Sequence, residues 1–162
     1  MAVILGEAYP DVFAGVGAHS GLPVGSARDV PSAFAAMAGR AIQSPDPEPG
    51  AALVRTIVFH GTGDATVHPS NSDAIARRAR ARHAPQSLET SCGGDAAGRG
   101  YTRDLSCGAD GTAIVEVWTI DGLGHAWSGG RAGGSHTDVT GPDASAEMVR
   151  FFFDPMSSGD PQ

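Results

Sequence analysis

The chain has 162 residues, of which 41% are hydrophobic and 18% are charged, values typical of a globular protein that can bury a core. Its formal charge of −7 argues against nucleic-acid binding, because no basic stripe is present to displace the counterions of a phosphate backbone. No apolar run reaches membrane-spanning length, so a membrane is not an expected partner either. We expect a single domain over residues 1–162.

Seven regular elements are expected, and helix and strand alternate along the chain. In order they are a helix over Ala2–Ala8, a strand over Val12–Ala18, a helix over Ala33–Gln43, a strand over Leu53–Phe59, a helix over Asn71–Ala81, a strand over Thr112–Ile120 and a helix from Asp143 to Phe153. The strands are largely runs of small or β-branched apolar residues, which suit a parallel sheet covered on both faces. The pattern therefore predicts an α/β fold with about three parallel strands, joined by right-handed crossovers and flanked by helices.

Three connections contain few core-forming residues and are expected to be irregular: the proline-rich Ser44–Gly50, the glycine-rich segment from Cys92 to Cys107, and Ser128–Thr140, which we expect to be mobile. The two cysteines close a short loop, which predicts a disulfide in an exported protein, with a model-dependent gain of about 3 kcal/mol. Two reduced thiols are the alternative if the chain stays in a reducing compartment.

Two of the strands run into polar, glycine-rich loops. Asp64 follows the strand Leu53–Phe59, and His125 follows the strand Thr112–Ile120. Open α/β sheets bind their ligands at the carboxyl ends of strands, and a carboxylate there can hold an imidazole in one tautomer and stabilise its protonated form. We therefore predict that Asp64 and His125 face each other within hydrogen-bonding distance. The alternative is that the two residues are an ordinary turn aspartate and a structural histidine.

A metal site in the first of these loops is disfavoured. His60, Asp64 and His68 are zinc-ligand types, but their four-residue spacing aligns side chains only on a helix, and Gly61 and Pro69 oppose a helix there. Neither cysteine has a partner at C-x-x-C spacing. We therefore expect no metal ion and no cofactor.

The two loop motifs resemble those of a known enzyme group. HGTGDATVHP at residues 60–69, followed by GLGHAW at 122–127, is similar to the catalytic domain of the polyhydroxybutyrate depolymerase and feruloyl esterase group of α/β-hydrolases. YPDVFAGVGAHSGLPVG from Tyr9 resembles the segment after the nucleophile helix of that group, and GPDASAEMVRFFF resembles its final helix. The similarity runs from about residue 1 to about Phe153, and it implies that Asp64 is the triad acid and His125 the triad base.

The same resemblance predicts a truncated hydrolase. The group places its nucleophile in a G-x-S-x-G elbow, which this sequence lacks, so we expect the chain to be the C-terminal half of an α/β-hydrolase domain. In the group, Val12–Ala18 would lie beside the nucleophile strand, so its edge is expected to be bare here. An unprotected apolar edge is an association site, which predicts a homo-oligomer.

The resemblance implies hydrolysis of a small-molecule or polymeric carboxylic ester by a secreted protein, and a Cys92–Cys107 disulfide would agree with secretion. Ser20 is the candidate for a displaced nucleophile activated by His125, with the Gly21 and Leu22 amides as oxyanion donors. The alternative is that Ser20 only lines the substrate pocket. His19 and Trp127 are the expected substrate-binding residues, with ordinary core packing as the alternative for Trp127. The second function class is a non-catalytic fragment that keeps only the triad acid and histidine.

Overall fold

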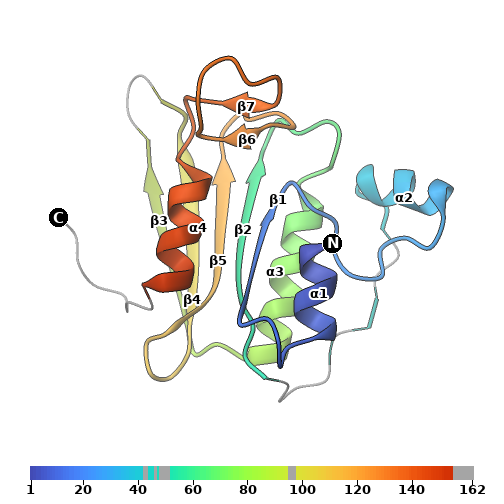
Figure 1. Cartoon of the computed structure of the whole chain (residues 1–162), viewed down its shortest axis with the longest axis vertical. Coiled ribbons are helices and arrows are strands. Elements are labelled where there is room, and N and C mark those ends of the chain that lie inside the picture. Colours follow the sequence, from blue (N-terminus) through green and yellow to red (C-terminus); the bar gives the residue numbers. More distant parts are fainter. Residues whose placement is uncertain (42–43, 46, 48–51, 95–97, 155–162) are drawn as a thin grey trace.

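The computed structural model describes residues 1–41, 44–45, 47, 52–94 and 98–154. Its centre is a mixed five-stranded sheet in the order β1–β2–β5–β4–β3 (Figure 1). The strands are β1 (Gly15–His19), β2 (Arg55–Gly61), β3 (Ser87–Gly93), β4 (Tyr101–Cys107) and β5 (Ala113–Ile120), and the helices are α1 (Ala2–Ala8), α2 (Val30–Met37), α3 (Ser70–His83) and α4 (Ala144–Phe153). A short two-stranded sheet joins β6 (Trp127–Ser128) to β7 (Thr137–Asp138).

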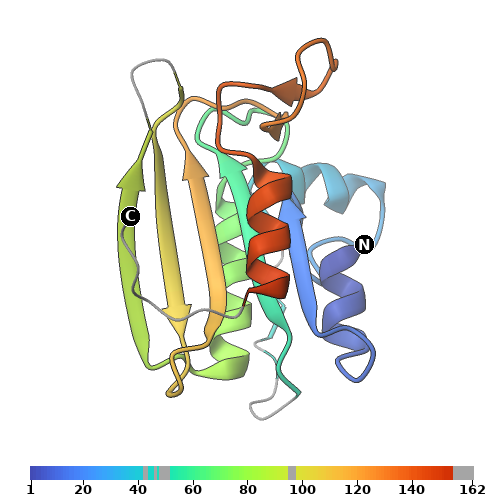
Figure 2. The same ribbon diagram turned by 60° about the vertical axis from the view of Figure 1, so that its left-hand side comes forward.

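The predicted parallel half of the sheet is confirmed. β1 pairs with β2, and β2 pairs with β5, both in parallel, so β2 is the central strand of the three. The helices form two layers, with α4 on one face of the sheet and α1 and α3 on the other (Figures 1 and 2). Ile57 and Phe59 pack in the core with Phe151 of α4, whereas Val58 packs with Ile75 of α3. This two-sided burial is why β2 reads as a continuous apolar run.

α4 lies unusually close to β1 because that strand contains two glycines. A Cβ on Gly15 would lie 2.9 Å from the Phe152 ring, and one on Gly17 would lie 2.8 Å from the Met148 sulfur. On β5, the buried Glu116 carboxylate accepts hydrogen bonds from Arg103 and Arg150, which connects β4, β5 and α4. Asp143 precedes α4 as its N-cap, because its side chain accepts hydrogen bonds from the amides of residues 145 and 146.

The Cys92–Cys107 segment corrects two predictions. It was expected to be an irregular loop, but it forms most of an antiparallel hairpin, β3 and β4, whose polar and half-exposed side chains give little hydrophobic signal in the sequence. The register places Cys92 opposite Thr102 and Cys107 opposite Ser87. The two sulfurs therefore lie about five residues apart along the hairpin, or roughly 17 Å, whereas a disulfide needs Cα atoms within about 7 Å. Both cysteines are free, and the disulfide prediction is wrong.

Smaller differences concern the ends of elements. β1 begins at Gly15 rather than at residue 12, and β2 continues through His60 and Gly61. α2 ends at Met37, well before Gln43, which lies outside the described residues, as does most of the Ser44–Gly50 connector. The segment expected to be only a mobile loop, residues 128–140, contains strand pairing between β6 and β7. No helix in the described ranges is long and apolar enough to cross a membrane.

We predict that Gly61, the last residue of β2, cannot be replaced without moving the His125 loop. A Cβ at this position would lie 2.0 Å from the Leu123 carbonyl oxygen, so Gly61→Ala should lower the free energy of unfolding by about 2–3 kcal/mol. Urea denaturation measures this loss. Gly124→Ala is the matched control, because nothing lies within 4 Å of its added Cβ, and it should change stability by less than about 0.5 kcal/mol. Equal losses in the two variants would contradict the prediction.

Candidate active site

The candidate site lies at the carboxyl ends of β2 and β5, where two neighbouring loops are connected by hydrogen bonds. The Thr62 amide donates to the Ile120 carbonyl at 2.9 Å, and the Gly63 amide donates to the Leu123 carbonyl at 3.0 Å. In return, the Gly122 amide donates to the Thr62 hydroxyl at 2.8 Å. These backbone contacts fix the Asp64 loop against the His125 loop before either side chain is considered.

Asp64 and His125 form the contact predicted from the sequence. His125 Nδ1 lies 2.9 Å from Asp64 Oδ2. The Asp64 side chain is fully buried, whereas 42% of the His125 side chain is exposed. With Nδ1 donating its proton to the carboxylate, Nε2 is the basic nitrogen of His125 and belongs to the exposed part of the site. This is the geometry of an acid that orients a general base.

The Asp64 carboxylate is held by several donors. Its Oδ1 accepts hydrogen bonds from the Thr66 amide at 3.0 Å and from the Val67 amide at 2.8 Å. Burial opposes ionisation, but the hydrogen bonds from Val67, His125, Ser20 and Thr66 outweigh it and hold the pKa of Asp64 below its ordinary value. The residue is therefore a carboxylate at neutral pH.

His60 is a third member of this cluster, and it was considered from the sequence only as a metal ligand. It is almost completely buried, its Nε2 donates to the Val67 carbonyl at 2.8 Å, and the same nitrogen lies 3.4 Å from Asp64 Oδ2. His60 thus supports the turn that carries Asp64. Its role could have been predicted by extending the apolar strand Leu53–Phe59 by two residues, because His60 is then a buried strand residue.

The metal alternative gains no support from the structure. His68 lies apart from the other two candidates, and its Nδ1 pairs with the Ser70 hydroxyl at 2.9 Å. In the part of the chain that the structure describes, no group of three histidine, cysteine, aspartate or glutamate side chains could hold a metal ion.

His19, a predicted substrate-binding residue, lies at the end of β1 between two aromatic rings. Its ring stacks on Phe59 and on Trp127, with centroid distances of 5.9 Å and 5.0 Å. The Ser128 amide donates to Nε2 at 3.0 Å, so the proton of the neutral ring is on Nδ1. Burial, with repulsion from His60 and His125 and partial compensation from Asp64, lowers the pKa of His19 to about 4.

Ser20, the candidate nucleophile, lies in the same cluster but is oriented toward the acid. Its backbone is in the left-handed region, with φ of 50°. The Ser20 hydroxyl lies 3.4 Å from His19 Nδ1 and hydrogen-bonds to Asp64. Among the described residues, no hydrogen bond connects any hydroxyl or thiol to His125. Ser20 therefore lies beside His19 and lines the same cavity as His125 without a hydrogen bond to it, while the oxyanion roles of Gly21 and Leu22 remain predictions.

A cavity of about 320 Å³ opens beside these residues, a size suited to a small ligand. Its lining consists of His19, Ser20, His125, Ala126, Trp127 and His136. Trp127 is 37% exposed and donates from its indole nitrogen to the Ser145 hydroxyl at 3.2 Å. His136 was missed from the sequence because it lies in a glycine-rich segment without periodicity. It reaches the cavity because its carbonyl accepts a hydrogen bond from the Trp127 amide.

Comparison with known proteins indicates a distant and partial relationship. No protein-family model matches the chain. The chain is 29% identical over 141 residues to poly(3-hydroxyalkanoate) depolymerase C of Paucimonas lemoignei, an alignment that covers 77% of this chain and 32% of the relative. The chain thus spans about a third of the length of the curated relative it matches. This similarity supports a depolymerase-like or esterase-like hydrolase at most, and it assigns no catalytic residue.

We predict that the neutral, buried His19 makes folding pH-dependent. Because the pKa of His19 is lower in the folded protein than in the unfolded chain, the unfolded chain binds more protons between about pH 6.5 and pH 4. Stability should therefore fall as the pH decreases through this window, by up to about 3 kcal/mol from His19 alone. Urea denaturation at pH 7 and pH 4.5 measures the loss.

His19→Gln should reduce this loss, since glutamine does not titrate. The pKa of His83 is also lowered, by burial and by Arg82. His83→Gln therefore measures how much of the loss of stability at low pH comes from a histidine outside the candidate site. Identical pH profiles for the natural chain and His19→Gln would show that His19 is not the group responsible.

Proposed function

We propose that the chain is a carboxylic ester hydrolase of the α/β-hydrolase type, similar to polyhydroxyalkanoate depolymerases and feruloyl esterases. The observation that carries the proposal is the 2.9 Å contact between the buried Asp64 carboxylate and the exposed His125 at the ends of two adjacent parallel strands. The distant similarity to a poly(3-hydroxyalkanoate) depolymerase points in the same direction. The order acid then histidine along the chain also agrees with the α/β-hydrolases.

In the proposed mechanism His125 is the general base. Nε2 of His125 accepts the proton of the attacking hydroxyl, and the positive charge that develops on the ring is stabilised by the Asp64 carboxylate at Nδ1. The same proton is then delivered to the oxygen of the departing alcohol, and the acyl group stays bonded to the nucleophile. In the second step His125 takes a proton from water, the water oxygen attacks the acyl carbon, and the acid leaves as the proton returns to the oxygen of the nucleophile. Asp64 stays ionised throughout, in agreement with the hydrogen bonds that keep its pKa low.

The nucleophile is the part of the proposal that the chain supplies least directly. Ser20 lines the same cavity as His125, but its hydroxyl is among the hydrogen-bond partners of Asp64. The Ser20 side chain would have to change rotamer before His125 could accept the proton of its hydroxyl. The alternative source is a hydroxyl from a partner chain. Without an elbow nucleophile and the adjoining backbone amide of the oxyanion hole, catalysis should be slow and confined to activated esters. Substrate binding and partial stabilisation of the transition state alone accelerate such reactions by about 10³-fold over water.

The cavity supports a short ester unit as the substrate in this proposal. Trp127 and Ala126 give it an apolar wall next to His125, and its volume suits one short acyl or hydroxyacyl unit rather than a long chain held whole. In a polymeric ester, one unit of the polymer would enter the cavity, and the ester bond of that unit would be cleaved. Secretion of the protein, which would suit a polymeric substrate, is part of this proposal.

A second candidate function is favoured by one observation. Because no hydroxyl or thiol among the described residues bonds to His125, the chain alone could be a non-catalytic relative that keeps the acid and the base. This candidate predicts that hydrolysis of activated esters does not exceed the rate of imidazole in solution.

The decisive experiment compares hydrolysis of p-nitrophenyl acetate by four single variants and one double variant. If Ser20 is the nucleophile, Ser20→Ala and His125→Ala should each lower kcat by a factor on the order of 10³, with KM little changed, and the double variant should be scarcely worse. Asp64→Asn should also reduce kcat strongly, because the base then loses its orienting carboxylate. His136→Ala is the control, since it lines the same cavity without contacting the acid–base pair.

A fluorophosphonate probe gives an independent readout. It should label Ser20 in the natural chain and fail to label the His125→Ala variant, as shown by mass spectrometry of the peptides. If Ser20→Ala keeps full activity while His125→Ala loses it, His125 acts on water or directly on the ester. If neither change matters, the turnover is background and the non-catalytic candidate is correct.

A further inference from the structure

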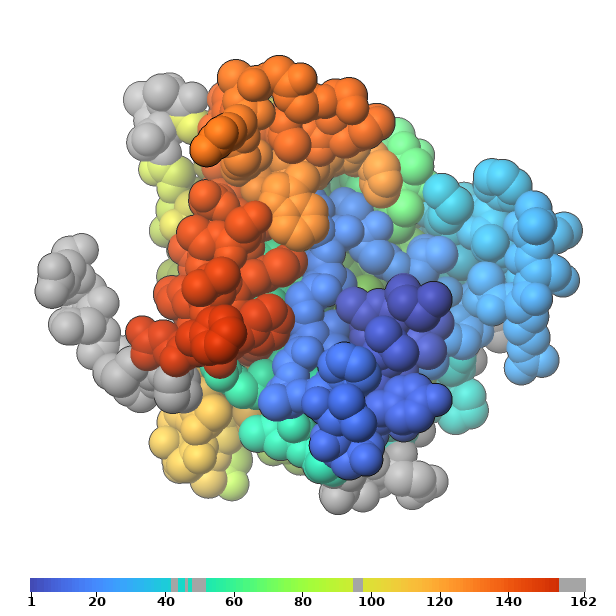
Figure 3. Space-filling view, viewed as in Figure 1, coloured from blue at the N-terminus to red at the C-terminus, as the bar shows by residue number. Residues whose placement is uncertain are grey.

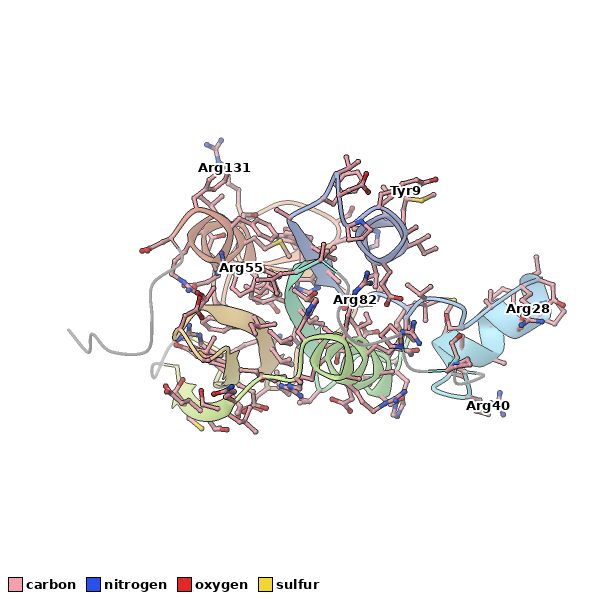
Figure 4. All side chains as sticks on the ribbon, turned by 90° about the horizontal axis from the view of Figure 1, so that it is seen from below. Tyr9, Arg28, Arg40, Arg55, Arg82 and Arg131 are labelled. Atoms are coloured by element: carbon pink, nitrogen blue, oxygen red, sulfur yellow. The ribbon has the colours of Figure 1, made fainter. Side chains whose placement is uncertain are left out.

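Ester hydrolysis at this site needs a hydrogen-bond donor for the oxygen of the substrate carbonyl, because that oxygen gains negative charge as the hydroxyl attacks. Six described residues line the cavity, and none of them is a lysine or an arginine. Arg131, in the segment between β6 and β7, is exposed and points away from the body of the molecule in Figure 4. Among the described residues, the donor must therefore be a neutral group of the cavity wall.

Most N–H groups of the cavity wall already have acceptors. The backbone amides of Ser20, Ala126 and Trp127 each donate to a backbone carbonyl at 2.8–2.9 Å. The indole nitrogen of Trp127 donates to a serine hydroxyl at 3.2 Å, and Nδ1 of His125 donates to the buried acid. The ring of His136 is exposed, and no hydrogen bond among the described residues fixes it. This leaves one fixed ring N–H, at the end of β1.

His19 provides this N–H group. Its Nε2 accepts the proton of the Ser128 amide at 3.0 Å, so the proton of the neutral ring is on Nδ1. Nδ1 lies 3.4 Å from the hydroxyl oxygen of Ser20, which is longer than the distance of about 2.7–3.2 Å in an ordinary N–H···O hydrogen bond. The Nδ1–H group is therefore only weakly engaged, in a residue that lines the cavity.

The orientation of the His19 ring is fixed before any ligand binds. The ring stacks on Phe59 and on Trp127, with interplanar angles of 9° and 26°. In Figure 3 the orange segment that carries Trp127 meets the blue β1 segment at the surface. Burial lowers the pKa of His19 to about 4, so the ring is neutral at pH 7 and keeps its single proton on Nδ1. A donor fixed in this way needs no reorganisation as charge develops on a substrate.

We propose that His19 is a catalytic hydrogen-bond donor, whose Nδ1–H group binds the carbonyl oxygen of the ester in the cavity and stabilises the negative charge that develops there. This role rests on the proposed ester hydrolase function. The attacking oxygen bonds to the carbonyl carbon as its proton passes to His125, and the π electron pair of the carbonyl moves onto the oxygen that faces His19. The electron pair returns as the alcohol leaves with that proton, and His19 keeps its own proton throughout.

Two substitutions separate this role from a structural one. His19→Asn places an amide N–H near the position of Nδ1 but removes the acceptor for the Ser128 amide, whereas His19→Gln keeps an acceptor near the position of Nε2 and removes the donor. In hydrolysis of p-nitrophenyl acetate, His19→Gln should lower kcat by at least about tenfold with KM little changed, while His19→Asn should keep most of the activity. If His19 only holds the Ser128 amide in place, the order of the two variants is reversed.

His83→Gln is the matched control. Nε2 of His83 also accepts a backbone amide, that of Val54 at 3.4 Å, but His83 does not line this cavity. The substitution should therefore leave kcat unchanged. Circular dichroism verifies that all three variants are folded.

NMR of the chain with ¹⁵N-labelled histidine tests the donor without any turnover. His19 should show a protonated Nδ1 and an unprotonated Nε2. Addition of methyl 3-hydroxybutyrate, an ester that is not activated, should shift the Nδ1 signal of His19, because the carbonyl oxygen of the ester becomes its acceptor. A proton on Nε2 instead of Nδ1 would overturn the proposal.

The kinetic and NMR results distinguish a failure of this role from a failure of the proposed function. If His125→Ala abolishes turnover while His19→Gln retains it, the chain is an esterase and His19 is not its oxyanion donor. If the turnover of the natural chain is only background, the hydrolase proposal fails, and the NMR titration decides whether His19 binds the carbonyl. A shift of the Nδ1 signal then keeps His19 as a donor to bound esters, and an unchanged signal overturns that role as well.

Discussion

The parallel pairing of β2 with β5 is the constraint on which the candidate site depends. It brings the loops after the two strands to one edge of the sheet, and backbone hydrogen bonds between Thr62, Gly63, Gly122 and their partners then join the loops directly. Gly61 allows this approach, since any side chain at the end of β2 would meet the Leu123 carbonyl. The distance between Asp64 and His125 is therefore a property of the backbone, and the two side chains complete a contact that the sheet has already arranged.

This dependence explains how much of the molecule could be predicted from the sequence. A buried parallel strand produces a continuous apolar run, and glycines mark the loop that follows it, so β2, β5 and the meeting of Asp64 with His125 follow from local patterns. The hairpin of β3 and β4 does not, because its strands are polar and its stability comes from pairing with β5, a partner that local composition does not reveal. The disulfide prediction failed for the same reason, since the separation of Cys92 and Cys107 is set by the hairpin register.

Ser20 lines the cavity that His125 also lines, but its role as nucleophile stays a prediction, and the orientation of its hydroxyl is what the sequence could not provide. The residue occupies the end of β1 beside Asp64, as its position after an apolar strand indicated. Its left-handed backbone and the fixed tautomer of His19 decide where the hydroxyl points. The Ser128 amide holds Nε2 of His19, which leaves the Nδ1 proton facing Ser20, and the Ser20 proton is then available to Asp64. This sequence of contacts involves three segments that are distant along the chain.

The environment of Asp64 finally separates the roles of the acid and the base. The Val67 and Thr66 amides, the Ser20 hydroxyl and His125 all bond to the carboxylate, and His60 fixes the turn that carries it. Removing any one donor would leave the others in place, so the orientation of Asp64 does not depend on a nucleophile being present. His125 is different, because its Nδ1 is fixed while 42% of its side chain is exposed and the residue lines the cavity. In the proposed mechanism the chemistry is therefore decided by which proton donor reaches the exposed side of His125, since the position of the Asp64 carboxylate is already set.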